Sequence, residues 1–394
     1  MILRYPSYYD KFRCIAGDCE STCCAGWEID IDDESYRYYM SVPGEFGRRL
    51  REHIKQYEPE DEGAYESHGF LLKKNKRCPF LNAENLCDIY RELGEEALCE
   101  VCTNTPRNLL EYGGERELSI SASCPEAARL LYRSSEITTF VEKEIEDHLD
   151  FEESEEEIAF AGLIRRARDG GIRILQYRQL SVYERLAAFL EYAKEVQMCL
   201  NENEPERIVT LSPEDFIRER EEKTWKKGRL SNGEKHRYGL FLKRMISFTS
   251  MESISEEWEE MLKLLERQFA APSDGAARYE KAITGLQGYL EDSDREYEYE
   301  QLLVYYTFLC VSRCVDDYDF LGKAKVVAVS FLMIRDMDAA LFVEKGEKYE
   351  KADRIKVVGI YARELEHSEE NMEYLAEEFL FGEGYRTEDI IDSI

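Results

Sequence analysis

The chain has 394 residues, of which 43% are hydrophobic and 34% are charged, with 52 basic against 83 acidic side chains and a net charge of −31. This hydrophobic fraction is enough to form a folded core and excludes wholesale disorder. The acidic excess argues against nucleic acid as a partner, because phosphate backbones are bound by clustered lysine and arginine. It favours basic partners such as lysine-bearing segments.

The amino-terminal sequence, Met1–Cys14, has no basic region followed by an apolar core, so a secretory signal is not expected. The longest apolar run, Val326–Ile334, is about half as long as a membrane-spanning helix. We therefore expect a cytoplasmic protein with no membrane partner.

The cysteines are concentrated near the amino terminus. Nine of the twelve lie in the first third of the chain, namely Cys14, Cys19, Cys23, Cys24, Cys78, Cys87, Cys99, Cys102 and Cys124. Stable disulfides are uncommon in the cytosol, so such a cluster favours a metal site or redox chemistry. Thiolates suit zinc, copper(I) or iron–sulfur clusters. We predict that these nine cysteines form the pool of metal ligands.

The spacing of these cysteines leaves the number of centres open. Only Cys99 and Cys102 have the two-residue separation usual in a zinc knuckle. Adjacent residues such as Cys23 and Cys24 normally project in different directions, and this expectation argues against both binding one small ion. Nine thiols exceed the four ligands of one zinc or one 4Fe–4S cluster. The excess allows two centres, or one centre with redox-active thiols.

The rest of the first third is predicted to have mostly irregular structure. Alternation of apolar and acidic residues over 27–32 predicts one short strand, with Asp30, Asp32 and Asp33 on a solvated edge rather than at a metal. His53 and His68 are expected to be surface or locally hydrogen-bonded side chains. A region so rich in cysteine is expected to depend on its metal for folding.

The cysteine cluster ends at Cys124, and an acidic run covers 142–157. We place a boundary near residue 135, which gives a cysteine-rich metal or iron–sulfur domain at 1–135 and a helical domain at 136–394. The acidic run itself is interpreted as a solvated helix face.

Residues beyond 135 have the periodicity of helices. An apolar stripe at steps of three and four predicts a helix over 182–200, and a second stripe covers 258–269 after a capping box formed by Ser253 and Glu256. Further helices are predicted over 300–313 and 323–335, in an all-α domain of about eight helices. Cys199, Cys310 and Cys314 are interpreted as core residues, the last two on one face of the third helix. The predicted fold is mainly α, with an irregular amino-terminal region that includes a short strand.

No dinucleotide-binding, phosphate-loop, zinc-protease or serine-hydrolase motif is present. A Rossmann-type methyltransferase or dehydrogenase is therefore disfavoured. Gly113-Gly114 and Gly170-Gly171 are interpreted as turns.

Five motifs occur in a characteristic order. They are Y-x2-F-x-C-x2-G-D-C-x3-C-C-x-G-W at 9–27, C-P-F-L at 78–81, L-C-D-I-Y at 86–90, C-x2-C-x3-P-R at 99–107 and S-C-P-E-A-A-R at 123–129. Together they resemble the amino-terminal part of the flagellin lysine-N-methylase family. The second and third also resemble the broader zinc- or iron-chelating cysteine-cluster domains. The motifs cover residues 9–132.

The resemblance implies an enzyme that methylates the ε-amino groups of surface lysines on flagellin. It implies S-adenosylmethionine as the methyl donor and a 4Fe–4S cluster held by the cysteines, with zinc as the alternative. The chain lacks the C-x3-C-x2-C triplet and the α/β barrel pattern of radical S-adenosylmethionine enzymes. Reductive cleavage of the donor and simple binding of the donor therefore both stay open. Arg107, in the last part of the fourth motif, is a candidate to steady a thiolate or carboxylate.

A methylase of this kind needs a base, since lysine has a reference pKa of about 10.4 and must lose a proton before its nitrogen attacks a methyl group. A carboxylate or a tyrosine can take that proton, and Tyr36, Tyr38 and Tyr39 follow the first motif. Two other classes of function remain: a non-catalytic zinc- or iron-binding module whose helices bind a partner, and a thiol redox sensor.

Overall fold

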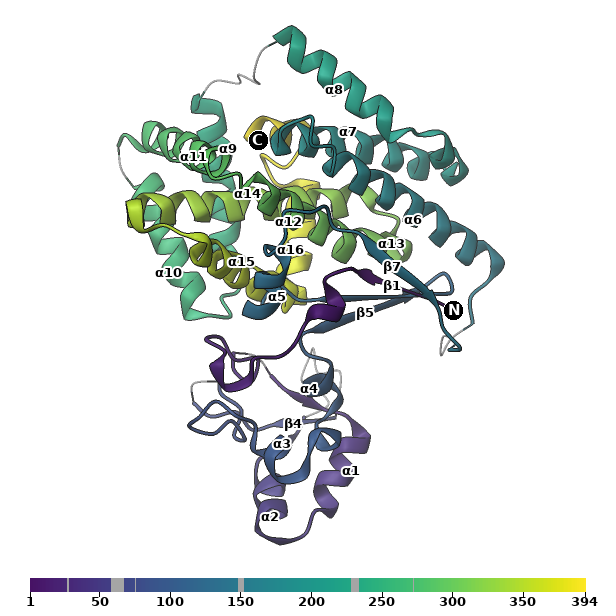
Figure 1. Ribbon diagram of the computed structural model, residues 1–394, viewed down its shortest axis with the longest axis vertical. Coiled ribbons are helices and arrows are strands. Elements are labelled where there is room, and N and C mark those ends of the chain that lie inside the picture. The colour runs from purple at the N-terminus through teal and green to yellow at the C-terminus, as the bar shows by residue number, and fades with distance from the viewer. Residues whose placement is uncertain (27, 58–66, 75, 148–151, 228–233, 272) are drawn as a thin grey trace.

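The computed structural model of the chain describes residues 1–26, 28–57, 67–74, 76–147, 152–227, 234–271 and 273–394. The chain forms a large lobe of helices with a four-stranded sheet at one side, and a small lobe that projects from that side (Figure 1). The small lobe contains α1 to α4 and a second, three-stranded sheet. The predicted class, mainly α with an amino-terminal region that includes strand, is confirmed.

The small lobe has a modest core of its own. Its helices are α1 (Asp33–Ser41), α2 (Gly44–Glu52), α3 (Asp88–Leu93) and α4 (Glu100–Asn104), and its antiparallel sheet has the order β2 (Asp30–Ile31), β4 (His68–Phe70), β3 (Ile54–Gln56). Ile31, Tyr39 and Phe80 are buried in this core. The strand predicted over 27–32 is present as the two-residue β2, while Trp27 lies outside the described residues.

The sheet of the large lobe joins segments from both sides of residue 135. Its order is β5 (Arg107–Tyr112), β6 (Glu115–Ile120), β1 (Ile2–Pro6), β7 (Phe140–Glu144). The β5–β6 hairpin turns at Gly113-Gly114, where both residues have positive φ, as a two-residue hairpin turn requires. β1 runs parallel to β6 and antiparallel to β7. The division of the chain near residue 135 stays a prediction, and the pairing of β1 with β7 crosses it.

A short helix, α5 (Pro125–Leu131), follows β6. The helices of the remaining chain are α6 (Glu155–Leu175), α7 (Val182–Asn201), α8 (Pro213–Lys227), α9 (Glu234–Ser250), α10 (Glu256–Leu265), α11 (Gly275–Asp292), α12 (Glu296–Cys310), α13 (Cys314–Asp317), α14 (Phe320–Lys345), α15 (Lys351–Glu366), α16 (Glu369–Phe381) and α17 (Thr387–Ser393). In the part of the chain that the structure describes, these exceed the eight helices that we expected, because several are shorter than three turns and carry no long apolar stripe.

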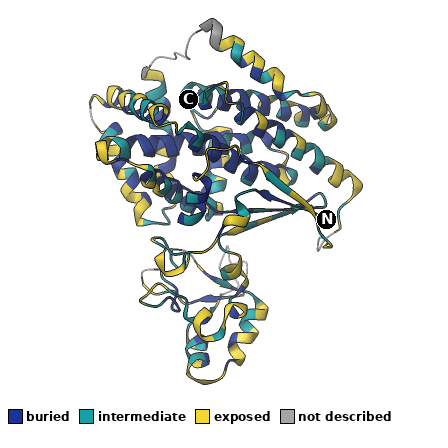
Figure 2. Ribbon diagram, in the orientation of Figure 1, coloured by how far each residue is buried: buried dark blue, intermediate teal, exposed yellow. Residues whose placement is uncertain are grey.

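The centre of the large lobe is α14, which contacts α7, α11, α12 and α15. It is buried on every side over most of its length, as expected of a helix that is apolar all round. Figure 2 shows the buried residues gathered in α7, α12 and α14, whereas the small lobe is mostly exposed or partly exposed.

The predicted helices are present, with three differences. The first stripe corresponds to α7, and Cys199 is buried as expected. The second corresponds to α10, but Ser255, not Ser253, caps it, so the predicted capping box is wrong. Cys310 and Cys314 are both buried, yet they lie on α12 and α13, because a short 3-10 turn separates these helices. The fourth helix, α14, extends ten residues beyond the predicted end at Arg335.

A buried ion pair fixes β6 against the helices. Arg168 of α6 and Glu117 of β6 approach to 2.6 Å, and both side chains are almost fully buried. Tyr112 of β5 adds a hydrogen bond of 3.0 Å to Ser312. These contacts hold the end of β6, and the loop after it, in a defined position on the large lobe. In the described residues, no helix is both long and apolar enough to cross a membrane.

Candidate functional site

The nine amino-terminal cysteines fall into two spatial sets. We call Cys24, Cys78, Cys87, Cys99 and Cys102 the small-lobe set, because all five pack in or against the core of the small lobe. We call Cys14, Cys19, Cys23 and Cys124 the junction set, because they lie where the segment 14–23 meets α5 of the large lobe. The two sets come closest at the adjacent Cys23 and Cys24.

Two isolated bridges draw the small-lobe set together. Ala25 pairs with Arg77, and the Cys78 N–H donates to the Cys24 carbonyl at 2.8 Å, so these two cysteines lie side by side. Leu81 pairs with Cys87, which folds the third motif back on the second. Burial raises the pKa of Cys78 to about 12, and the nearby thiols of Cys24 and Cys87 add to the rise.

The other two members of this set are joined to each other. The side chain of Cys102 hydrogen-bonds to Cys99 and lowers the pKa of Cys99, while the same contact raises the pKa of Cys102. The nearby thiols of Cys24 and Cys78 raise the pKa of Cys102 further. The phenol of Tyr39 donates to the Ala97 carbonyl at 2.7 Å beside this pair, so Tyr39 is a packing residue.

Cysteines begin three of the short helices. Cys87, Cys99 and Cys124 are the N-cap residues of α3, α4 and α5. Burial raises the pKa of Cys124, and the backbone N–H groups of Ala127 and Glu126 oppose that rise. Positions at a helix start favour a thiolate, because the unpaired N–H groups and the helix dipole stabilise negative charge there. The donor set therefore has the chemistry that a thiolate-bound metal or cluster requires.

The junction set is more open to solvent. Cys14 and Cys23 are exposed, and Cys19 and Cys124 are partly exposed. The hydrogen bond from Cys23 lowers the pKa of Cys24 to about 7, and the same contact raises the pKa of Cys23. The thiols of Cys14 and Cys19 lie near enough to Cys124 to raise its pKa as well.

Among the described residues, no three cysteine, histidine, aspartate or glutamate side chains converge as a metal site. His53 Nδ1 instead donates locally to the Arg49 carbonyl at 2.9 Å, and His68 stacks on Tyr36 with ring centroids 3.6 Å apart. Which of the nine cysteines bind a metal stays a prediction.

A polar cluster lies immediately beside Cys124 and was not expected from the sequence. Ser121 and Ser123 follow β6, and Glu366 and His367 form the end of α15. Ser121 donates to Glu366 at 2.6 Å, and Ser123 lies 2.8 Å from His367 Nε2. Tyr305 of α12 donates to Glu366 at 2.8 Å. Only the serines carry a sequence signal, since Ser123 begins the last cysteine motif and Ser121 lies two residues before it.

This polar cluster forms part of the walls of two pockets. One pocket, of about 360 Å³, is called the Ser123 pocket and is lined by charged and hydroxyl side chains that include Ser21, Ser123, Arg129, Lys356 and Arg363. The other, of about 440 Å³, is called the His367 pocket and is lined by Asp30, Asp32, Glu100, Arg107 and His367, among others. Ser123 of the first pocket and His367 of the second are in hydrogen-bond contact, so this contact forms part of the wall between the two pockets.

Arg107 contacts two aromatic side chains, and its predicted role of steadying a thiolate or a carboxylate stays a prediction. Its guanidinium lies 5.4 Å from the centre of the Phe12 ring and hydrogen-bonds to Tyr9. Asp32 caps α1 and accepts from the Glu100 N–H at 2.8 Å, which ties α1 to α4. These two residues therefore shape the His367 pocket from opposite lobes.

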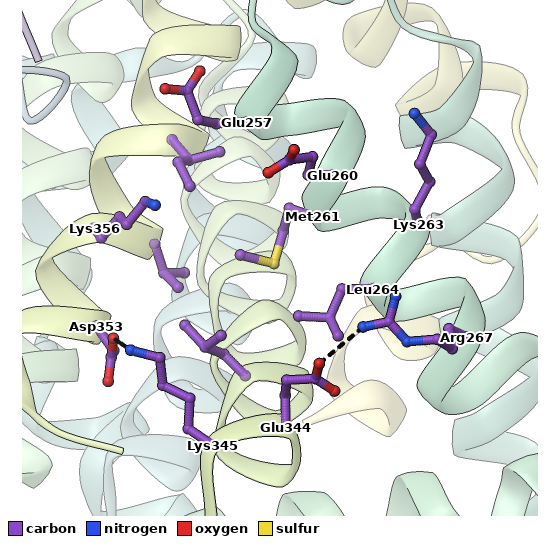
Figure 3. A pocket seen from close by; sticks show the side chains of 13 residues that line it. Glu257, Glu260, Met261, Lys263, Leu264, Arg267, Glu344, Lys345, Asp353 and Lys356 are labelled. Carbon is purple, nitrogen blue, oxygen red and sulfur yellow. Dashed lines mark hydrogen bonds and ion pairs between the residues drawn. The ribbon is translucent and has the colours of Figure 1, made fainter. Parts of the chain in front are cut away.

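A third hollow continues the Ser123 pocket along the large lobe. It measures about 470 Å³, lies between α10, α14 and α15, and is called the α10–α15 groove (Figure 3). Its charged side chains pair at one end, Lys345 with Asp353 and Arg267 with Glu344. It shares four lining residues with the Ser123 pocket, namely Glu257, Asp353, Lys356 and Ile360. An extended segment in the groove would reach the Ser123 pocket without leaving the surface.

Comparison with known proteins finds similarity to lysine N-methylases and to a flagellar biosynthetic protein. The model of the FliB lysine N-methylase C-terminal domain matches residues 168–389, more than half of the chain. The lysine-N-methylases of Salmonella typhimurium strain LT2 and Salmonella choleraesuis are each 26% identical over 153 residues, which is 36% of this chain and 35% of theirs. The flagellar biosynthetic protein FliU of Salmonella muenchen is 25% identical over 151 residues, 81% of its length. The matched segment thus spans about a third of the two methylases. No solved structure matches the chain.

Proposed function

Because the chain belongs to the FliB lysine N-methylase family, we propose that it transfers a methyl group from S-adenosylmethionine to the ε-amino group of lysines on flagellin or on another lysine-bearing protein. The observation that carries the proposal is the family match over residues 168–389, which includes α15 and His367. His367, which lies at the contact between the two pockets, is within the matched segment. The ordered cysteine motifs of residues 9–132 support the proposal independently.

The reaction requires that the methyl donor and the lysine be in contact and that the lysine lose one proton. The neutral lysine nitrogen attacks the methyl carbon, the carbon–sulfur bond breaks, and the sulfonium becomes a neutral thioether. At neutral pH the amine is protonated, so an acceptor for that proton must lie near the nitrogen. Two pockets that meet at one hydrogen-bonded contact can hold the two ligands side by side.

In this proposal the Ser123 pocket takes the methyl donor. Arg129, Lys356 and Arg363 line it together with acidic and hydroxyl side chains, a mixture suited to a polar, charged ligand. The His367 pocket takes the lysine. Asp30, Asp32 and Glu100 lie around it, so the pocket is negative overall and suits a cationic side chain.

The proposed cofactor is a 4Fe–4S cluster, with zinc as the alternative, held by cysteines of the small-lobe and junction sets. What supports it is the chemistry of the donor set: nine thiols, three of them at helix starts. Such a cluster would supply an iron that binds the amino and carboxylate groups of the methyl donor. The chain's own residues bring the thiols next to the Ser123 pocket, since Cys124 directly follows Ser123.

A thiol redox sensor is the second candidate function. Two pairs of thiols, Cys23 with Cys24 and Cys99 with Cys102, are in hydrogen-bond contact. A sensor predicts reversible oxidation of these pairs with no essential metal. A non-catalytic metal module instead predicts bound metal without turnover.

The proposed function is tested with chain purified and reconstituted without oxygen, then incubated with flagellin and a methyl donor whose methyl group carries deuterium. Mass spectrometry of the flagellin should find deuterated methyl-lysine, and flagellin with acetylated lysines should remain unlabelled. The Cys78→Ser variant should lose transfer, whereas Cys199→Ser, a matched buried cysteine of the large lobe, should keep it. A metal-replete chain that labels neither flagellin nor a lysine-rich peptide would overturn the proposal.

A further inference from the structure

A continuous line of hydrogen bonds connects the His367 pocket to a carboxylate in the large lobe. His367 Nε2 lies 2.8 Å from Ser123 Oγ, and Ser123 Oγ lies 2.7 Å from Ser121 Oγ. Ser121 Oγ donates to Glu366 Oε2 at 2.6 Å. Every link is short enough for a proton to move along it.

The backbone holds this line in place from two elements. On one side, the Ala122 N–H, between the two serines, donates to the Tyr305 hydroxyl at 2.9 Å. Tyr305 in turn donates to Glu366, so the same phenol fixes the loop and the carboxylate. On the other side, α15 ends at Glu366 and directs His367 into the pocket. Ser121 and Ser123 are 1% and 6% exposed, so water does not compete for their hydroxyls.

The groups around Glu366 favour a carboxylate that accepts and releases a proton near neutral pH. The titratable side chains that face it are Tyr8, Tyr305, Tyr306, Tyr361 and Cys310. His367 follows it in sequence and shares the Ser121 hydroxyl with it. Burial raises the pKa of Glu366 to about 7, and the hydroxyl donors moderate that rise. Within the described part of the chain, no lysine or arginine forms an ion pair with Glu366 at 4 Å or less.

The pKa of His367 is shifted in the opposite direction to that of Glu366. Burial lowers the pKa of His367 to about 4, and the positive charge of Arg363 lowers it further. The imidazole is therefore neutral at physiological pH and cannot retain an extra proton. A proton that arrives on the ring is more stable on Glu366, at the far end of the line.

We propose that His367 takes the proton of the substrate ammonium and that Ser123 and Ser121 pass it to Glu366. The inference rests on the proposed function and assigns residues to its proton transfer. One proton joins the imidazole from the ammonium, and one leaves Nε2 for Ser123 Oγ. The Ser123 proton moves to Ser121, and the Ser121 proton moves to Glu366 Oε2. The lysine becomes a neutral amine, Glu366 becomes a carboxylic acid, and no bond other than O–H and N–H changes.

The test compares Glu366→Gln with Glu378→Gln in the full-length, metal-replete chain. Glu378 is a matched control, because it is also partly exposed, lies on the neighbouring α16 and accepts a serine hydroxyl, that of Ser247. We expect E366Q to slow methyl transfer by about 10²- to 10⁴-fold, the usual contribution of a positioned acid or base. In the wild type and E378Q, the rate should rise with pH as Glu366 loses its proton near pH 7. E366Q should lack this rise, and Glu366→Asp should restore part of the rate.

Two further variants distinguish loss of the proton relay from a folding defect. Ser121→Ala and Ser123→Ala leave the carboxylate in place and interrupt the line, so each should slow transfer while the thermal unfolding midpoint changes little. An unchanged rate and pH profile in E366Q, beside an active wild type, would overturn the relay and leave the methylase function intact. A wild-type chain with no methyl transfer would overturn both.

Discussion

The hydroxyl of Ser123 lies 2.8 Å from Nε2 of His367, although 244 positions separate the two residues in sequence. Ser123 belongs to the last cysteine motif, and His367 belongs to the segment matched by the FliB lysine N-methylase C-terminal domain. This contact joins the cysteine-rich region to the helical region at the point where two pockets meet. Under the proposed function, both regions therefore contribute residues to one active site.

The two thiol sets predict that bound metal is divided between two centres, one in each set. If each set holds its own centre, Cys78→Ser should remove the metal of the small-lobe set alone, and Cys124→Ser should remove that of the junction set alone. Iron, zinc and acid-labile sulfide per chain should be measured after anaerobic purification, together with the visible spectrum.

The control for this measurement is Cys199→Ser, which removes a buried thiol of the large lobe that belongs to neither set. Its metal content should equal that of the wild type. Complete loss of metal in both Cys78→Ser and Cys124→Ser would instead indicate one shared centre, with the adjacent Cys23 and Cys24 bringing the two sets together.

The small lobe should depend on metal for its stability more than the large lobe does. Its core is small and contains thiols, and structural zinc contributes about 10–16 kcal/mol of apparent folding free energy in small cysteine-rich peptides. Chelation should therefore make residues 28–106 sensitive to protease, while the fragment that contains α6 to α17 survives. Limited proteolysis with mass spectrometry measures this, and equal protection of both lobes after metal removal would contradict it.

Local periodicity predicts those helices whose stability comes from one apolar face. The stripe from Val182 to Leu200 corresponds to α7 almost residue for residue. The central helix extends past the predicted end at Arg335 for a physical reason: Arg335, Asp336 and Asp338 have charged side chains of the kind that usually ends a buried apolar helix, yet all three are buried here. Arg244 pairs with Asp336 at 2.7 Å, and Tyr299 donates to Asp338, so these charges are stabilised inside the core.

Long-range contacts set the features that sequence spacing does not predict. The Ser255 and Ile254 N–H groups donate to Glu364 of α15, which fixes the start of α10 at Ser255 instead of Ser253. Likewise, the bridge between Ala25 and Arg77 decides that Cys24 joins Cys78. The residue types of the cysteine pool were evident from sequence, whereas the polar cluster of Glu366 and His367 carries no local motif.

The Arg168–Glu117 pair predicts that mutations of the two residues have strongly non-additive effects on the free energy of unfolding. Arg168→Met alone should lower the free energy of unfolding by about 3–5 kcal/mol, because it leaves a buried carboxylate without its partner. The double variant Arg168→Met with Glu117→Leu should recover most of that loss, since the buried carboxylate is then absent and Asp169, the other ion-pair partner of Arg168, keeps Arg4. Urea unfolding at pH 7 gives both values. Equal losses in the single and double variants would mean that shape, not charge, dominates at this site.

Glu366 predicts a pH-dependent difference in stability between the wild type and Glu366→Gln. Its pKa is raised from 4.5 to about 7 in the folded chain, so the folded state holds the proton more tightly than the unfolded state does. Below pH 4.5 the carboxyl is neutral in both the folded and the unfolded state, so its burial does not lower the free energy of unfolding. As the pH rises from 4.5 to 7, burial of the charge destabilises the folded chain, by at most about 3 kcal/mol above pH 7.

Substitution by glutamine removes this cost, so the stability of E366Q relative to the wild type should increase between pH 4.5 and 7 and then level off. The comparison is made at each pH, because His367, whose pKa is lowered, contributes an opposite trend to both proteins. Unfolding by urea at several pH values, with Glu378→Gln as the control, measures the difference. A difference that does not change with pH would mean that the Glu366 carboxyl titrates as it does in water, and the terminal acceptor of the relay would then have to be another group.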